Sequence, residues 1–405
     1  MNKSFLKFWN NPCQLIYMVM FLLVLIGGIN VFSASFVMAR DMTGSGVYFL
    51  KRYFLFALGG FCGMAFVRRV GYKAWLNRRP LWAFFIVVFM MLLYVDAVGI
   101  ATKGASRWIY LGPISIQPSE FAKLSVIMLA SKYLGNMLRT GQRVSFFAKG
   151  DHRLVLAATF ICAVLVYKQP DLGTAAIIVA LVLGVYVIAG VPKWQLAGIF
   201  GVGGLAIIAT TLASSYRMGR VQVWFDPWLD PRGKGYQMVQ SLLAIGSGGL
   251  TGTPWGHGAG KFFYLPEAHT DFAFAIFCQE NGFLGAMFLL LLFALLGLAF
   301  CKITINARDR RGFLLAGGVT FLIIGQAVAN MAMVCGILPV IGVPLIFISY
   351  GGSSMVLSMA AIGLLLSVYD EEVKEAEQEA MPPEERRDNL RMVRNERWRS
   401  WRDSR

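Results

Sequence analysis

Long apolar segments that carry few charges recur along the chain, separated by short polar stretches. Ten of them lie near residues 15–36, 53–67, 81–98, 118–136, 154–167, 173–190, 194–213, 272–300, 312–335 and 353–368. A helix of about 20 apolar residues crosses the hydrocarbon core of a bilayer, where backbone polar groups must be satisfied internally. With 57% hydrophobic residues, the chain is predicted to be an all-α polytopic membrane protein with about ten transmembrane helices.

The charge and the cysteines narrow the possible functions. The net charge is +16, but in a membrane protein excess Lys and Arg mostly records orientation and attraction to anionic lipid. We therefore expect membrane lipid, and no nucleic acid, as a partner. The six cysteines have no CxxC spacing and there are only three histidines, which argues against a zinc site. Lys3 and Lys7 precede the first apolar segment like a signal peptide, but the further spans favour an uncleaved anchor.

Basic residues concentrate in alternate loops between the apolar segments. These are Arg68, Arg69, Lys73, Arg78 and Arg79; Lys132, Arg139, Arg143, Lys149 and Arg153; and Lys302, Arg308, Arg310 and Arg311. Cytoplasmic loops carry such an excess, and ten spans place both termini on one side. We expect both termini in the cytoplasm and the large loop at about 214–271, between spans seven and eight, outside it.

Two regions are distinguished by composition. Residues 1–369 hold all the apolar segments and form the predicted transmembrane domain, and residues 370–405 form a charged cytoplasmic tail. The tail begins acidic and becomes rich in arginine, without apolar periodicity, so it is expected to be disordered or surface-helical. Trp398 and Trp401, which lie among arginines, are candidates for contact with anionic lipid.

The most informative polar stretch is YLPEAHTDF, residues 264–272, which holds three side chains that exchange protons: Glu267, His269 and Asp271. Asp271 directly precedes an apolar run, and a carboxylate at a membrane boundary is costly without a task or a partner. A helix cap at Thr270 or Asp271 is the structural alternative. Capping accounts for one carboxylate but not for three titratable groups together.

Several cations lie in the loops expected outside, where orientation gives no reason for them. They are Lys103 and Arg107 in KGASRW, Lys168 in KQPDLGTA, Arg217, Arg220, Arg232, Lys234 and Lys261. Each could instead pair with an acidic residue, such as Asp226 or Asp230, or with lipid phosphate. Cations that converge near Asp271 suit a substrate with a phosphate or diphosphate.

A charged pair is predicted inside the fourth span, in IQPSEFAK. Pro118 suits the first helical position, and the helix dipole favours Glu120 in the first turn. Lys123 is three residues further on, so it can pair with Glu120 on one helix face. Ionisable pairs within membrane helices usually mark a cavity or pathway, so both residues are candidates for the site.

Two glycine-rich stretches, residues 246–260 and 339–354, interrupt apolar sequence on the side expected outside. Non-helical backbone at membrane depth is tolerated where protein buries it or where it lines a wet cavity. Both stretches are candidate cavity walls. A nucleotide-binding loop is disfavoured for the first, because no strand–helix context surrounds it.

These motifs, in this order, give the chain its resemblance to a known family. KGASRW, IQPSEFAK, QPDLGTA, DPWLDPRGKGYQMVQSLLAIGSGG, YLPEAHTDF and ISYGGSS resemble the SEDS family (shape, elongation, division and sporulation), the polytopic peptidoglycan glycosyltransferases that include FtsW and RodA. The DPW…GKGYQ pairing and Ala268 are closer to FtsW than to RodA. Two stretches depart from the family pattern: Cys278-Gln279-Glu280-Asn281 replaces its usual GEE, and the glycine stretch contains Thr253-Pro254-Trp255 and His257.

The resemblance implies an enzyme that polymerises lipid II into glycan strands at the outer face of the bacterial cytoplasmic membrane, with a septal role in cell division. Asp271 matches the family's catalytic aspartate, and Arg107, Glu120 and Lys123 match charged functional positions. Lys103, Lys261, Glu267 and His269 complete the expected substrate site. The implied partners are lipid II, the growing glycan strand, a class B penicillin-binding protein and other division proteins.

The expected reaction displaces a polyprenyl diphosphate from a sugar C1 with inversion, with Asp271 as the base. Cations, or a divalent ion such as Mg²⁺ or Mn²⁺, would stabilise the leaving group. Two other functions stay open on the sequence. A transporter (flippase) of the lipid-linked precursor fits ten spans with buried ions and glycine-broken helices, although the ionisable residues cluster toward one face. A scaffold that only anchors partners gives no reason for cations around a carboxylate.

Overall fold

The computed structural model describes residues 11–98, 107–112, 114–148, 150–212, 215–254 and 265–380. Each of the ten apolar segments forms a helix. The bounds of these helices are α2 Pro12–Thr43, α3 Tyr48–Val70, α5 Arg78–Val98, α6 Pro118–Arg139, α7 His152–Lys168, α8 Leu172–Ile188, α9 Lys193–Leu212, α12 Ala273–Asn306, α13 Arg310–Val334 and α14 Gly352–Ala380. The predicted helical architecture is confirmed for these segments.

Six of the helices among the described residues are long and apolar enough to cross a membrane: α2, α3, α5, α12, α13 and α14. Helix α8 is apolar but shorter. The protein is thus a polytopic helical membrane protein, and the number of ten spans stays a prediction.

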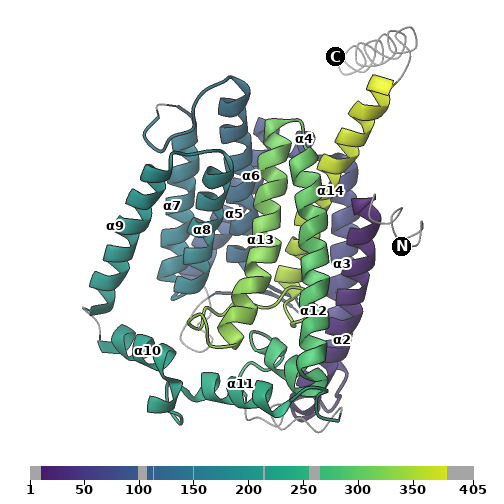
Figure 1. The fold of residues 1–405 in the computed structure, drawn as a ribbon, viewed down its shortest axis with the longest axis vertical. Helices are drawn as coiled ribbons and strands as arrows, with labels where there is room; N and C mark the ends of the chain where they lie inside the picture. The colour runs from purple at the N-terminus through teal and green to yellow at the C-terminus, as the bar shows by residue number, and fades with distance from the viewer. Residues whose placement is uncertain are drawn as a thin grey trace.

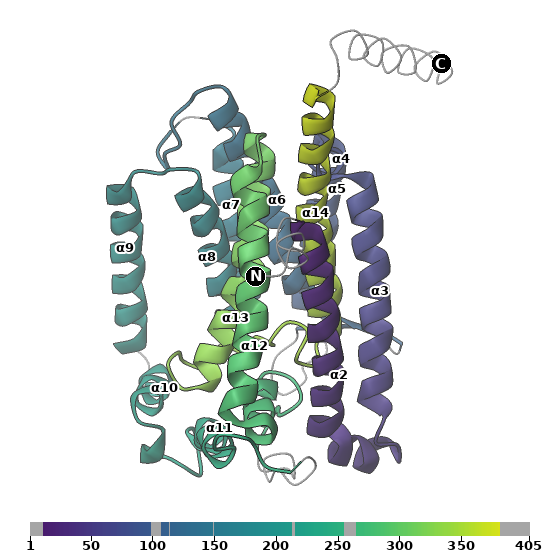
Figure 2. The ribbon, with the colours of Figure 1, turned by 45° about the vertical axis from the view of Figure 1, so that its right-hand side comes forward.

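The long helices run side by side in one bundle (Figure 1). Helix α14 packs against α3, α13 against α6 and α12 against α2. Figure 2 shows α9 at the edge of this bundle, leading into α10 (Ser215–Phe225) and α11 (Tyr236–Ser247), which lie across the end opposite the C-terminus. We refer to this end as the loop end, because the predicted large loop lies there.

Aspartates shape the described part of the loop between α9 and α12. Asp226 caps a short 3₁₀ helix, Pro227–Leu229, by accepting a hydrogen bond from the Trp228 amide at 3.0 Å. Asp230 accepts one from the Lys234 amide at 2.9 Å. Both carboxylates therefore order local turns. Helix α11 then attaches to the bundle, because buried Ser241 donates from its hydroxyl to the Val334 carbonyl at 2.8 Å.

The first glycine-rich stretch accepts hydrogen bonds from α12 where that helix is kinked. Gly282 has φ 64° and ψ −166°, so the helix kinks there. The amides of Phe283 and Leu284 donate instead to the carbonyls of Gly249 at 2.9 Å and Leu250 at 3.1 Å. The described part of this stretch thus supplies backbone acceptors to α12 at its kink, and Gly248 within it is buried, although Leu250 is 70% exposed.

A short antiparallel hairpin joins α5 to α6. Strand β1 (Ile109–Leu111) pairs with β2 (Ile114–Ile116), with Ile109 opposite Ile116. The sequence analysis did not predict this hairpin, because three-residue strands are too short to show periodicity in the sequence. The hairpin is tied to the start of α14, since the Ser353 hydroxyl donates to the Ser115 carbonyl at 3.0 Å.

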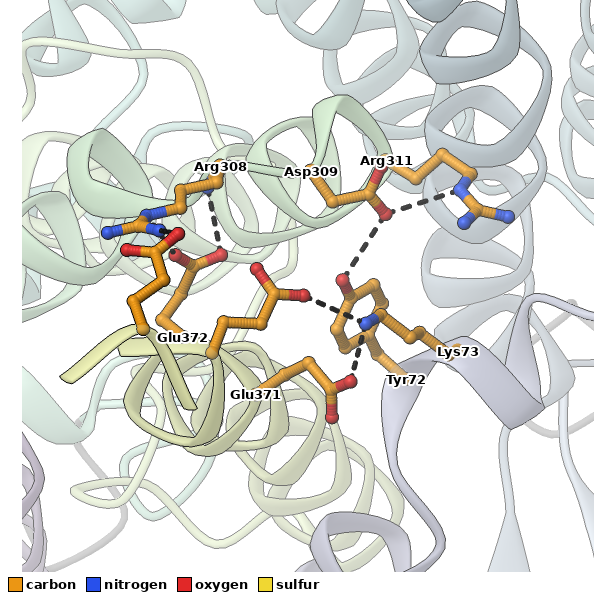
Figure 3. Close-up of polar contacts among 9 residues, drawn as sticks. Tyr72, Lys73, Arg308, Asp309, Arg311, Glu371 and Glu372 are labelled. Atoms are coloured by element: carbon orange, nitrogen blue, oxygen red, sulfur yellow. Dashed lines mark hydrogen bonds and ion pairs between the residues drawn. The ribbon is translucent and has the colours of Figure 1, made fainter. Parts of the chain in front are cut away.

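Helix α14 continues beyond the bundle at the end that carries the C-terminus (Figure 1). Ion pairs hold this extension on both sides, and Figure 3 shows those made by Lys73 and Arg308. They join Arg68 to Asp370 at 2.6 Å, Lys73 in α4 (Tyr72–Trp75) to Glu371 and to Glu375 at 3.2 Å, and Arg308 to Glu379 at 2.6 Å. Burial lowers the pKa of Lys73, but the two glutamates outweigh it and raise that pKa above its usual value.

Candidate functional site

Residues 265–272 form consecutive turns that lead into α12. The Glu267 carbonyl accepts hydrogen bonds from the amides of Thr270 at 3.1 Å and Phe272 at 3.2 Å, and the Thr270 hydroxyl donates to the Glu267 carboxylate at 2.9 Å. Phe272, not Thr270 or Asp271, is the N-cap of α12, and it makes no side-chain capping bond. The capping explanation for Thr270 and Asp271 is therefore wrong.

The Asp271 carboxylate faces the loop between α13 and α14. Gly342 in this loop has φ 71°, and a Cβ on it would lie 3.6 Å from Asp271 Oδ2. Glycine is favoured at a positive φ, and here it also lets the backbone pass close to the carboxylate. We refer to residues 339–351 as the site loop. The second glycine-rich stretch thus forms a wall beside Asp271.

His269 is anchored through its ring and its backbone. The ring lies 4.9 Å from that of Phe49 and 6.0 Å from that of Tyr350, centroid to centroid. The Tyr350 amide donates to the His269 carbonyl at 2.8 Å. His269 is 9% exposed. These contacts fix the turns of residues 265–272 against the site loop and α3.

The predicted pair in α6 forms, with Lys123 Nζ 2.7 Å from Glu120 Oε1. Lys123 is fully buried, and it also donates to Gln326 Oε1 on α13 at 2.9 Å. Gln326 in turn donates to the Pro344 carbonyl of the site loop at 3.4 Å. The buried charge is thus neutralised and hydrogen-bonded, which is the condition for keeping it in a low-dielectric interior.

Arg107 lies beside QPDLGTA. Its Nε donates to the Gln169 carbonyl at 3.1 Å, its guanidinium also donates to the Pro170 carbonyl, and it lies 3.9 Å from an Asp171 oxygen. Asp171 caps α8 by accepting from the Thr174 amide at 3.1 Å. Arg107 keeps a third of its side chain exposed, at 33%, so it can still meet a ligand.

The site loop and the start of α14 connect these motifs. The Tyr350 amide bonds to His269. The Pro344 carbonyl accepts from Gln326, which in turn binds Lys123. At the start of α14, Ser353 bonds to the hairpin that follows Arg107. A Cβ on Gly173, in QPDLGTA, would lie 2.1 Å from the Ile341 carbonyl, so α8 also touches the loop. Three sequence motifs, YLPEAHTDF, IQPSEFAK and QPDLGTA, therefore converge on this segment, and Arg107 of a fourth motif contacts the last of them. Lys103 and Lys261 lie outside the described residues.

Two buried residues that the sequence analysis did not select also contact this region: Asn30 on α2 and Asn330 on α13. Each donates hydrogen bonds to the chain near Asp271 and to the site loop. A polar side chain inside an apolar segment is the signal that could have identified them.

An apolar cavity of about 730 Å³ lies between α8, α12 and α13. Gln326, which binds Lys123, is in its wall, together with Leu181, Phe321 and Leu338. The cavity therefore adjoins the buried charged pair and suits an apolar chain.

No three His, Cys, Asp or Glu side chains come together as metal ligands in the part of the chain that the structure describes.

The fold and the site together define a polytopic helical membrane protein with a charged, partly buried site at the loop end of its bundle. A family model described as FtsW/RodA/SpoVE cell cycle protein matches residues 13–374. The chain belongs to this family, so the recognition made from its motifs is confirmed.

Its relatives are similar over most of their length. Stage V sporulation protein E of Bacillus subtilis is 37% identical over 360 residues, which are 88% of this chain and 97% of that protein. Probable peptidoglycan glycosyltransferase FtsW of a Geobacter species (strain M18) is 38% identical over 360 residues, or 88% and 96% of the two chains.

Solved structures share the fold. A chain from a study of polymerization and crosslinking by a peptidoglycan synthase complex is 28% identical, with a TM-score of 0.71, over 88% of this chain and 97% of that one. The crystal structure of Thermus thermophilus rod shape determining protein RodA is 25% identical, with a TM-score of 0.63, over 88% of this chain and 96% of that one.

Proposed function

We propose that the protein is a peptidoglycan glycosyltransferase that polymerises lipid II into glycan strands at the outer face of the cytoplasmic membrane, in septal wall synthesis. One observation carries the proposal: a chain of this family holds the Asp271 carboxylate against the site loop, where two further motifs converge. Relatives named as probable peptidoglycan glycosyltransferases support the activity, and their FtsW name supports the septal role.

In the proposed reaction the acceptor sugar hydroxyl attacks C1 of the donor sugar from the face opposite the diphosphate. The Asp271 carboxylate takes the hydroxyl proton, a new C1–O bond forms, and the bond from C1 to the diphosphate oxygen breaks with inversion. The electron pair leaves with the polyprenyl diphosphate. The leaving group carries its own charge, so it needs cations rather than a protonating acid.

The contacts divide the predicted cations by role. Lys123 is fully buried and bonded to Glu120 and Gln326, so we assign it a positioning role behind the site loop. Arg107 keeps an exposed fraction, so we assign it to the diphosphate. Lys103 and Lys261 are proposed beside it on the sequence alone. Glu267 and His269 would orient the acceptor or Asp271.

The apolar cavity and the charge distribution extend the proposal to lipid and protein partners. The cavity between α8, α12 and α13 has the apolar lining that a polyprenyl chain needs. The basic loops near the end of α14 support a cytoplasmic position for that end of the bundle and an outer position for the loop end. Similarity to a chain from a peptidoglycan synthase complex supports a class B penicillin-binding protein as the partner.

The test is glycan polymerisation from purified lipid II by the full-length protein in detergent, with and without a cognate transpeptidase. Wild type and Asp41→Ala are expected to make polymer, whereas Asp271→Ala makes none, because it lacks the base. Asp41 is a matched control, since it is an exposed carboxylate near the end of α2. Equal activity of Asp271→Ala would remove Asp271 as the base.

The transporter alternative gives a different result in the same preparation. Reconstituted protein would move fluorescent lipid II across the liposome bilayer, and neither the wild type nor any variant would form polymer from lipid II. That outcome, with the partner present, would replace the glycosyltransferase proposal.

A further inference from the structure

We propose that Asn330, together with Asn30, positions Asp271 for catalysis by tying the backbone carbonyls of residues 271 and 273 to the site loop. This inference rests on the proposed role of Asp271 as base. The hydrogen bonds of both asparagines go to backbone carbonyls, so both are positioning residues.

Asn330 bridges two backbone carbonyls. Its Nδ2 donates to the Asp271 carbonyl at 2.8 Å and to the Val343 carbonyl of the site loop at 2.6 Å. The residue is 1% exposed and projects from α13. One amide group thus joins the backbone of Asp271 itself to the loop that its carboxylate faces.

Asn30, on α2, likewise bridges two backbone carbonyls. Its Nδ2 donates to the Ala273 carbonyl, in the first residue of α12, at 3.0 Å and to the Ile348 carbonyl of the site loop at 3.3 Å. It is buried in α2. Asp271 and Ala273 are therefore each held to the same loop, and Phe272 between them is fully buried.

Both asparagines use only their donors. The Oδ1 atoms of Asn30 and Asn330 are buried and accept no hydrogen bond from the described residues. An Asn amide carries two N–H donors on one atom, so it can join two carbonyls at once. Rotating either side-chain amide by 180° would place its oxygen against the two backbone carbonyls. Repulsion between these oxygens therefore fixes the orientation of the amide.

This geometry limits what Asp271 can do. The asparagines hold the carbonyls of residues 271 and 273, and the Glu267 carbonyl holds the turn before Asp271 through the Thr270 amide. Together these bonds limit the direction of the Asp271 Cα–Cβ bond. General base catalysis needs the carboxylate within hydrogen-bond reach of the acceptor hydroxyl. A displacement of about 1 Å can lower the rate about 100-fold.

The kinetic experiment uses full-length protein with Asn330→Ala, Asn330→Asp and Asn30→Ala. The Asp variant keeps the shape of the side chain but replaces its two donors by acceptors. We expect kcat for lipid II polymerisation to fall about 100-fold with KM changed less than about twofold. Ser131→Ala is the matched control, since this fully buried residue of α6 makes its described hydrogen bond within its own helix, to Ile127. It should keep its kcat.

Hydrogen exchange on the same proteins reports the position of the chain without reference to activity. The Tyr350 amide, which donates to His269, should exchange about tenfold faster in the Asn330 variants, as loss of about one hydrogen bond implies. Faster exchange confined to residues 265–275 and 339–351 supports the inference. Unchanged exchange and kcat, or faster exchange in every helix, would overturn it.

The two proposals fail in different ways. An inactive wild type would remove the glycosyltransferase activity, and exchange would still show whether Asn330 fixes the chain at Asp271. An active wild type with an active Asn330→Asp variant would leave the activity in place and remove the positioning role.

Discussion

Removing the charge of Lys123 tests how the buried pair of α6 contributes to stability. Lys123→Met keeps the length of the side chain but leaves Glu120, whose side chain is 5% exposed, without its cation. It also leaves Gln326 Oε1 without a donor. Breaking a buried ion pair from one side costs about 3–5 kcal/mol. We expect a loss of that size in the free energy of unfolding.

A double variant separates the charge from the packing. Glu120→Gln with Lys123→Met removes both charges at nearly constant volume, and replacing both partners of a buried pair is often about neutral. It should recover most of the stability that the single variant loses. The surface pair is the comparison: Lys73 is 42% exposed, so Lys73→Met should cost less than about 1 kcal/mol.

The assay is equilibrium unfolding of each purified protein in mixed micelles with increasing SDS, followed by tryptophan fluorescence. If Lys123→Met had the same free energy of unfolding as the wild type, Glu120 would be taking up a proton or being hydrated with no loss of stability. A double variant as unstable as the single one would show that Lys123 acts through packing. Either result would refute the reasoning from paired burial.

Two further predictions concern backbone and ligand contacts. Gly282→Ala should lower the free energy of unfolding by about 1–3 kcal/mol, because it strains a positive φ and because a Cβ would lie 2.4 Å from the Gly252 nitrogen. The control in the same unfolding assay is Gly59→Ala, since a Cβ on Gly59 would have no atom within 4 Å. Arg107→Lys should raise KM for lipid II about tenfold, because a lysine cannot reproduce the planar fork that meets Gln169 and Asp171. An unchanged KM would contradict the proposed role of Arg107 in binding the diphosphate.

The sequence predicted the features that depend on local pattern. Apolar runs located ten helices, and a spacing of three residues predicted the pair of Glu120 and Lys123. Positive-inside counting predicted an orientation, which the structure does not test. The turns at YLPEAHTDF were recognised by their titratable residues, although the proposed cap was wrong.

The missing features depend on contacts between distant parts of the chain. Asn30 bonds to carbonyls 243 and 318 residues away, and no local periodicity encodes such a partner. The hairpin of residues 109–116 is too short to show a pattern. Arg107 could be selected as a cation, but its contact with the turn before α8 depends on how α7 and α8 pack.

Helix α14 joins the site loop to the charged extension as one continuous helix. It has 29 residues and so a length of about 43 Å, from the hairpin contact at Ser353 to the ion pairs at Asp370 and Glu379. A tilt of about 5° about one end moves the other by about 4 Å. A ligand of the charged extension would be linked to substrate binding only where both ligands distinguish between tilts of α14, and each would then change the affinity of the other by the same factor.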